Sequence, residues 1–111
     1  MSQASDKIRE LNDAFRTGKR SDLGEIVTTY GVTAHDSAFL AKAMLMTQTF
    51  NAFTSDNDPH GEHDFGSFEI DGELVYWKID YYDKAMEYGS EDPADEGVTC
   101  RVLTILLASE Y

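Results

Sequence analysis

Residues 65–82 read FGSFEIDGELVYWKIDYY, and their pattern is typical of a β-hairpin. The dipeptide Asp71-Gly72 is a strong two-residue turn signal, and apolar and polar residues alternate on both sides of it. If this turn sets the register, the pairs are Ile70 with Glu73, Phe68 with Val75, and Gly66 with Trp77.

The alternation predicts two different faces for the hairpin, because successive side chains of a strand point to opposite sides. One face is apolar and is assigned to the core: Phe68, Ile70, Val75, Trp77 and Ile79. The other face is acidic and aromatic and is expected to be half exposed: Glu69, Leu74, Tyr76, Lys78, Asp80 and Tyr82.

The segments around the hairpin predict three helices and one more strand. Residues 5–18 have helical apolar spacing, and residues 36–53 form a second helix capped by Asp36. Glu25–Thr29 is short and β-branched, which favours a strand. A last helix is expected from near Asp95 to the end. The order α-β-α-β-β-α predicts one α+β domain, residues 1–111, with a three-stranded antiparallel sheet packed against helices.

The composition predicts a soluble, cytoplasmic protein. The start of the sequence, MSQASDKIRE, does not resemble a secretion signal, and no apolar run approaches the roughly 20 residues of a membrane span. Cys100 is the single cysteine, so an internal disulfide is excluded.

The net charge of −12 is concentrated in one segment. Residues 56–96 contain 14 acidic residues and two lysines, Lys78 and Lys84, whereas the rest of the chain is neutral overall. Such a field repels nucleic acids and anionic membranes and attracts cations and basic protein surfaces. Direct binding to nucleic acid or to a membrane is therefore not expected.

The second half of the chain contains four long motifs: NDPHGEHDFG, WKIDYYD, EYGSEDPAD and RVLTILLASEY. Over about residues 52–111 the sequence resembles the bacterial family known as domain of unknown function 3768. The resemblance implies no activity, since none is assigned to the family. It implies a setting in bacterial genomes rich in mobile elements.

The loop TSDNDPHGEHDFG, residues 54–66, has the oxygen and nitrogen donors of a metal site. Asp56, Asp58 and Gly61 match the start of a calcium loop, but Ser67 stands where such a loop needs a bidentate glutamate. A transition-metal site is the other metal hypothesis. The candidate ligands are Asp56, Asp58, His60, Glu62, His63 and Asp64.

Two further interpretations of this loop remain open. A small hydrolytic enzyme could use His60, Glu62, His63 and Asp64 as acid, base or ligands. A structural role is equally compatible, since Asp and Asn close turns by hydrogen bonds to the backbone. No cofactor is expected.

The preferred hypothesis is an acidic protein-interaction module. Its surface would bind the basic groove of a nucleic-acid-handling complex, as a mimic of nucleic acid that inhibits a bacterial restriction or CRISPR system. The predicted partner-binding residues are Asp56, Asp58, Glu62, Glu69, Asp71, Glu73, Tyr76, Asp80, Tyr82, Asp83, Glu87, Glu91, Asp92, Asp95 and Glu96.

The N-terminal end is basic in comparison. It contains Lys7, Arg9, Arg16, Lys19 and Arg20. These residues form either a solvated face or a contact with the acidic half of a second copy, which would give a head-to-tail homodimer.

Overall fold

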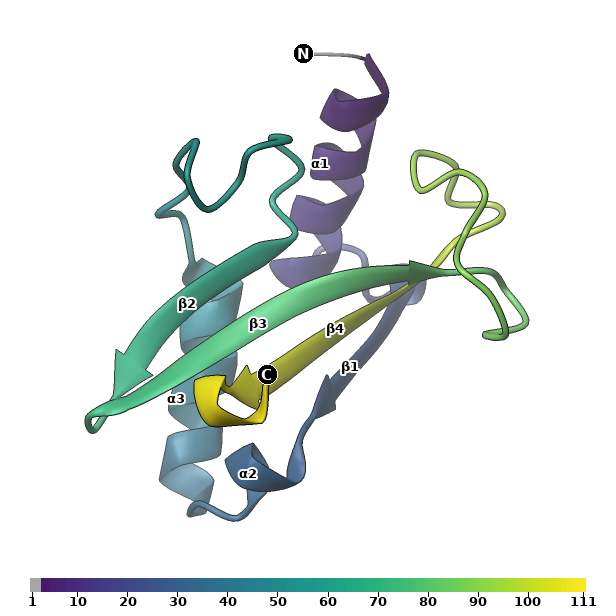
Figure 1. Cartoon of the computed structure of the whole chain (residues 1–111). Coiled ribbons are helices and arrows are strands. Elements are labelled where there is room, and N and C mark those ends of the chain that lie inside the picture. The colour runs from purple at the N-terminus through teal and green to yellow at the C-terminus, as the bar shows by residue number, and fades with distance from the viewer. Residues whose placement is uncertain (1–2) are drawn as a thin grey trace.

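The computed structural model describes residues 3–111, which form three helices, four strands and two short 3₁₀ turns (Figure 1). The helices are α1 (Gln3–Arg16), α2 (Tyr30–Thr33) and α3 (Ser37–Thr49). The strands are β1 (Gly24–Thr28), β2 (Phe65–Ile70), β3 (Glu73–Tyr82) and β4 (Cys100–Leu107). The 3₁₀ turns are η1 (Ser21–Leu23) and η2 (Ala108–Glu110).

The strands form one mixed sheet in the order β1-β4-β3-β2. β1 runs parallel to β4, while the other two pairs are antiparallel. Helices α1 and α3 lie on the same side of the sheet, and within residues 3–111 the opposite face carries no α-helix, only the short η2 turn after β4 (Figure 1). The α+β class is therefore confirmed, with helices on one face only.

The hairpin of β2 and β3 has the predicted register. Phe68 pairs with Val75, and Gly66 pairs with Trp77. Asp71 and Gly72 have φ values of 52° and 81°, the left-handed conformation that a tight two-residue hairpin turn requires at both positions. Local turn chemistry and the alternating pattern agree here, and no tertiary contact overrides them.

The predicted C-terminal helix is wrong, because its residues form strand β4. Every second residue of β4 is buried: Arg101, Leu103, Ile105 and Leu107. The first of them is charged, so the alternation of apolar and polar residues that is typical of a strand is hard to detect in the sequence. β4 lies between β1 and β3 and pairs with both along its length. Pairing with two neighbouring strands outweighs the weak helical spacing. The sheet therefore has four strands and a mixed sense, not three antiparallel ones.

The helices cover the apolar face as expected. In α1, Leu11 and Phe15 are buried against the sheet. The carboxylate of Asp36 accepts the Phe39 N–H at 2.9 Å and caps α3, which ends at Thr49 rather than at residue 53. None of the helices in residues 3–111 combines the length and apolar character that a membrane span requires.

Trp77 is at the centre of the core and has no exposed surface. The rings of Phe50 and Phe53 meet it edge-on, with centroids 5.6 and 6.1 Å away. A side chain at Gly66, the residue paired with Trp77, would overlap the indole ring. This close approach explains why a glycine stands in the middle of strand β2.

Candidate functional site

Loop 51–64, between α3 and β2, folds back onto helix α1. The Asp58 carboxylate is buried and accepts the N–H groups of Glu62 and His63, both at 3.1 Å. The Arg9 guanidinium donates to the Gly61 carbonyl at 3.2 Å. Asp58 therefore closes a turn, as aspartates do in loops, and α1 holds that turn in place.

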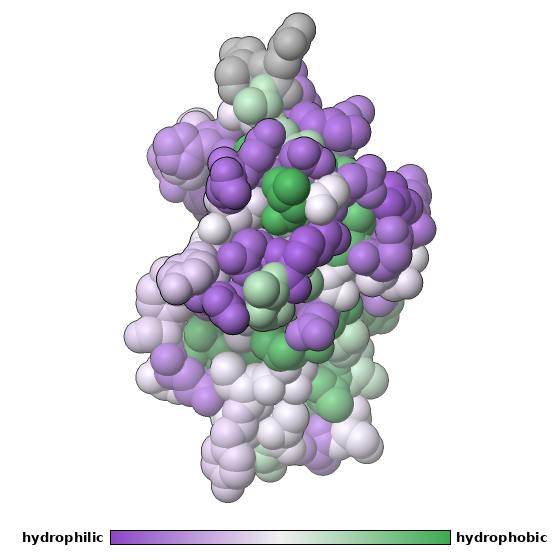
Figure 2. Space-filling view, turned by 90° about the vertical axis from the view of Figure 1, so that its right-hand side faces the viewer, coloured by the Kyte–Doolittle hydropathy of each residue, from purple (hydrophilic) through white to green (hydrophobic). Residues whose placement is uncertain are grey.

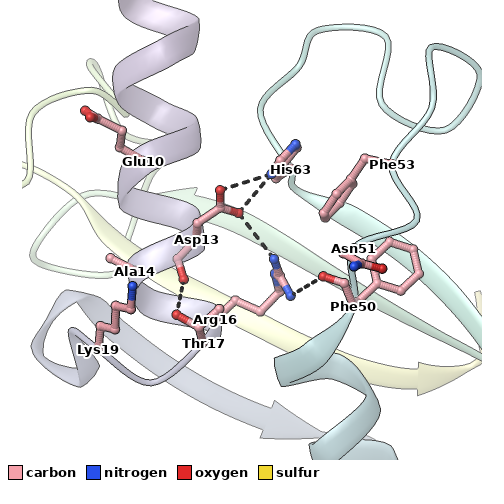
Figure 3. A pocket seen from close by; sticks show the side chains of 10 residues that line it. All are labelled: Glu10, Asp13, Ala14, Arg16, Thr17, Lys19, Phe50, Asn51, Phe53 and His63. Carbon is pink, nitrogen blue, oxygen red and sulfur yellow. Dashed lines mark hydrogen bonds and ion pairs between the residues drawn. The ribbon is translucent and has the colours of Figure 1, made fainter.

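His63 lies between the carboxylates of Asp13 and Asp58, and Figure 3 shows its contact with Asp13. Its Nδ1 is 2.9 Å from Asp13 Oδ1, and its Nε2 is 3.6 Å from Asp58 Oδ2. The Phe53 ring stacks on the imidazole with centroids 3.7 Å apart. The backbone of His63 has φ 56°, which a non-glycine residue adopts only when its surroundings hold it there.

A surface cleft of about 510 Å³ lies between α1 and loop 51–64. His63, Phe53 and Asp13 line one side of it, with Arg16 below (Figure 3). Arg16 is buried, and its guanidinium donates to the carbonyls of Thr47 and Phe50 at 2.8 and 3.0 Å. Burial lowers the pKa of Arg16, while hydrogen bonding to Asp13 opposes this effect. Arg16 thus caps the C-terminal end of α3.

A chain of hydrogen bonds continues from this loop across the strands at the same end of the sheet. The Tyr81 hydroxyl donates to Glu62 Oε1 at 3.0 Å and accepts from Asn12 Nδ2 at 2.9 Å. The Asn12 side-chain oxygen accepts from Arg101 Nε at 2.6 Å, and Arg101 donates to the Pro93 carbonyl at 2.7 Å. Burial raises the pKa of Tyr81, so its phenol stays protonated. This buried chain connects loop 51–64 with loop 83–99.

The predicted catalytic residues of loop 51–64 do not converge on one another. His63 faces Asp13, Glu62 faces Tyr81, and His60 is exposed. Burial and the neighbouring Glu62 charge raise the pKa of Asp64. Among residues 3–111, no group of three or more His, Cys, Asp or Glu side chains is arranged to hold a metal ion. The cluster has the geometry of a packed, hydrogen-bonded loop.

Loop 83–99, between β3 and β4, presents its charges to solvent. It contains six carboxylates and one lysine. Three aspartates accept backbone N–H groups two to four residues further on and remain at the surface: Asp83, Asp92 and Asp95. Figure 2 shows hydrophilic residues gathered over this region, with separate hydrophobic residues among them. The exposed apolar residues of the loop are Met86, Tyr88 and Val98.

The backbone of loop 83–99 is held by internal contacts. The Ser90 hydroxyl is 2.7 Å from the Thr99 hydroxyl, which also donates to the Asp92 carbonyl at 2.8 Å. The N–H of Ser90 donates to the Tyr81 carbonyl at 3.0 Å. Glu96 forms an ion pair with Arg20, next to η1. The carboxylates of the loop therefore project from a defined scaffold.

The predicted half-exposed face of the hairpin is confirmed as the face without a helix. Glu69 and Leu74 are exposed, and the other members are partly buried. The Tyr76 ring contacts Phe65 and Tyr111, with centroids 5.2 and 5.6 Å away. This uncovered face ends at Tyr82, where loop 83–99 begins, so the two are continuous.

The structure divides the predicted partner-binding residues among four places. Two groups adjoin each other: Asp83, Glu87, Glu91, Asp92, Asp95 and Glu96 in loop 83–99, and Glu69, Tyr76, Asp80 and Tyr82 on the uncovered face. Asp71 and Glu73 lie at the hairpin turn, and Asp56, Asp58 and Glu62 lie in loop 51–64. Asp58 and Glu62 are engaged by contacts within the chain.

The sequence did not indicate the structural roles of four polar residues: Asn12, Arg16 and Arg101, which are buried, and Asp13, which is partly exposed. Arg16 does not belong to a basic surface, because it is buried beneath α3, and Arg20 pairs with Asp22 and Glu96 of the same chain. For Arg101 a signal existed, since it occupies a core position in the alternation of β4. The spacing of Asn12 gives no such signal, because its partners lie 50 residues away or more, and neither does the contact of Asp13 with His63, 50 residues further on.

Comparison with known proteins identifies a family and no activity. No curated protein matches the chain, and no solved structure matches it. One family model matches residues 28–110, from the end of β1 to η2. The chain therefore belongs to the family described as protein of unknown function DUF3768.

Proposed function

We propose that the chain is a protein-interaction module that binds a basic protein surface. Its binding surface comprises loop 83–99 and the adjoining uncovered face of the sheet. The observation that carries the proposal is the combination, in one ordered loop, of outward-facing carboxylates with exposed apolar side chains. Glu87 and Glu91 make no hydrogen bond or ion pair through their carboxylates to the rest of residues 3–111, so both are available to a partner.

The order of loop 83–99 favours binding. Fixing a flexible loop on association costs free energy, and a loop already held by its own hydrogen bonds avoids much of that cost. Ser90 within the loop, Thr99 just before β4 and Arg101 in β4 supply those bonds. A partner would therefore meet carboxylates in fixed positions.

The two kinds of side chain have different roles in this proposal. The carboxylates steer a basic partner and set the orientation of approach. Tyr88, which is 72% exposed, and Met86 supply the apolar contact that tight interfaces concentrate in a few residues. The loop thus offers both a charged rim and an anchor.

A narrower form of the proposal concerns the partner. Carboxylates spaced along a surface can replace phosphates in a groove that normally receives nucleic acid. We infer that the partner is a nucleic-acid-handling complex of a bacterial defence system, such as a restriction or CRISPR nuclease, and that the chain blocks its groove.

Charge reversal provides the test. Purified restriction and CRISPR nucleases are assayed for DNA cleavage with and without the chain, at increasing salt. We expect inhibition of at least one nuclease, weakening as salt rises. The double variant Glu87→Lys with Glu91→Lys should lose inhibition and keep its fold, because both side chains are exposed.

A matched control carries the same change of charge elsewhere. Glu10→Lys with Asp56→Lys alters exposed residues of α1 and loop 51–64 and should inhibit like the parent chain. Equal loss of inhibition in both double variants would reject loop 83–99 as the binding surface. A chain that inhibits none of the nucleases and binds none of them would reject the narrower form.

A further inference from the structure

Strand β1 is an edge of the sheet with an open outer side. It pairs with β4 alone. The Thr29 N–H donates to the Ile105 carbonyl at 3.1 Å. Because backbone groups alternate in direction along a strand, the N–H and C=O groups of every second residue before Thr29 in β1 also point toward β4. The intervening residues, Ile26 and Thr28, consequently direct their N–H and C=O groups away from the sheet. No contact within residues 3–111 occupies these outward groups.

The side chains of β1 lack the features that protect an edge strand. Natural edges usually carry lysine, proline or a bulge, which prevent the addition of another strand. β1 reads GEIVT, and its Ile26 and Val27 side chains are 41% and 40% exposed. The other edge strand, β2, exposes the polar residues Ser67 and Glu69. The β1 edge is therefore the apolar one.

A cavity of about 320 Å³ adjoins β1 on the helix side of the sheet. It is lined by Phe15, Arg16, Gly18, Ser21, Gly24, Ile26 and Gln48. A strand added beside β1 would direct alternate side chains to this side of the sheet. One of them would enter the cavity between Phe15 and Ile26, which favours an apolar side chain there.

The charge around β1 favours a basic occupant. Glu25 is exposed on the strand, and at its beginning the carboxylates of Asp22 and Glu96 share the single cation Arg20, which leaves one excess negative charge there. Glu25 lies on the uncovered side of the sheet with Val27, since the two are separated by two positions. In Figure 2 the lower part of this face, where β1 and α2 lie, is mostly white, pale purple and green, with fewer strongly hydrophilic residues than the part above it. With a net charge of −12 per chain, a second copy is repelled.

We propose that the β1 edge binds an extended segment of a partner protein, which adds a fifth strand to the sheet. Apolar side chains of the segment lie on the helix side, one of them in the cavity, and lysine or arginine side chains lie beside Glu25. This mode of recognition takes affinity from main-chain hydrogen bonds and specificity from alternate side chains. It relies on the backbone edge of β1 rather than on the side chains of loop 83–99, and it does not depend on the function proposed there.

A synthetic peptide of seven alternating valine and lysine residues, labelled with a fluorophore, serves as the probe. Its binding to the full chain is measured by anisotropy at physiological salt. A second peptide of the same sequence carries N-methyl groups on the alternate amides that would face β1. We expect the N-methylated peptide to bind about tenfold more weakly, because one or two hydrogen bonds are lost without a change of charge. Equal affinity of the two peptides would overturn the proposal.

Protein variants distinguish peptide binding at the β1 edge from peptide binding at loop 83–99. Ile26→Pro removes an outward N–H and leaves the bonds to β4, and it should weaken binding of the unmodified peptide by a similar factor. Glu87→Lys with Glu91→Lys should retain the difference between the two peptides. Loss of that difference in the loop variant would overturn the assignment to β1.

Amide NMR spectra of the parent chain give a readout that does not require a variant to fold. The peptide should shift the signals of Ile26 and Thr28 more than those of loop 83–99. The reverse pattern would overturn the proposal. A chain that dimerises without peptide, and whose dimer excludes the peptide, would overturn it in favour of a second copy.

Discussion

Loop 51–64 contains four carboxylates and two histidines, and loop 83–99 contains six carboxylates and one lysine. The first faces α1, which supplies Asp13 and Arg9 as partners, so several of its polar groups, including Asp58 and His63, turn inward. The second has no helix opposite it, and its aspartates bond only to nearby backbone. The comparison shows that the packed neighbour decides whether a carboxylate becomes part of the fold or remains available for binding.

The largest effect on the difference between the two loops is expected when the core beneath loop 51–64 is removed. Trp77→Ala deletes the buried ring on which Phe50 and Phe53 pack. We expect the free energy of unfolding to fall by about 3–5 kcal/mol, measured by urea denaturation. Under native conditions, the amides of residues 51–64 should lose protection from hydrogen exchange before those of loop 83–99. Simultaneous loss in both loops would contradict the inference that the two are held separately.

An aspartate from each loop gives a more direct comparison. Asp58→Ala leaves the buried N–H groups of Glu62 and His63 without their acceptor, and we expect a loss of about 1.5–3 kcal/mol. Asp95→Ala removes one bond, to the Gly97 N–H in an exposed turn, and should cost less than about 1 kcal/mol. Urea denaturation of both variants checks the order. Similar losses would mean that loop 83–99 is as much a part of the fold as loop 51–64.

The smallest effect concerns Asp64, at the end of loop 51–64. Burial raises its pKa above the ordinary value of 3.8, so ionisation is harder in the folded chain than in the unfolded chain. The carboxylate therefore destabilises the fold at neutral pH, and this penalty disappears as the pH falls below the ordinary value. We expect Asp64→Asn to stabilise the chain at about pH 7 and to have no effect below about pH 3.

Thermal denaturation across this range measures the effect. Asp56→Asn, at an exposed position of the same loop, is the control for the change of charge. A gain at Asp64 that does not change with pH would show that burial of the charge is not its cause.

The hairpin, the strand at β1 and the first two long helices could be predicted from the sequence because their signals are local. The dipeptide at residues 71 and 72 fixes a register, and Asp36 caps α3 within three residues. The identity of β4 could not be predicted in the same way. Its Arg101 is buried because Asn12 and the Pro93 carbonyl accept its hydrogen bonds. No residue near Arg101 in the sequence indicates that its hydrogen-bond acceptor is Asn12, which is 89 residues away.

The candidate site was predictable to a similar degree. The concentration of acidic residues in 56–96 is visible in the sequence, and so is the exposed face of the hairpin. The division of those residues between a loop held by α1 and a loop open to solvent depends on tertiary packing. His63 illustrates this, because its nearest carboxylate belongs to Asp13, 50 residues earlier.

The central position of β4 has a consequence for how the protein is made. In the sheet, β1 does not touch the β2–β3 hairpin, and β4 is the strand that joins them. During translation both pieces are synthesised before residues 100–107, so the sheet cannot close until those residues have been added and have emerged. Until β4 pairs with β3, Trp77 and its neighbours lack the strand that covers their edge, and a chain in which β4 has not yet paired exposes a hairpin edge prone to pair with other chains. We therefore expect the chain to fold only after the ribosome has released residue 107.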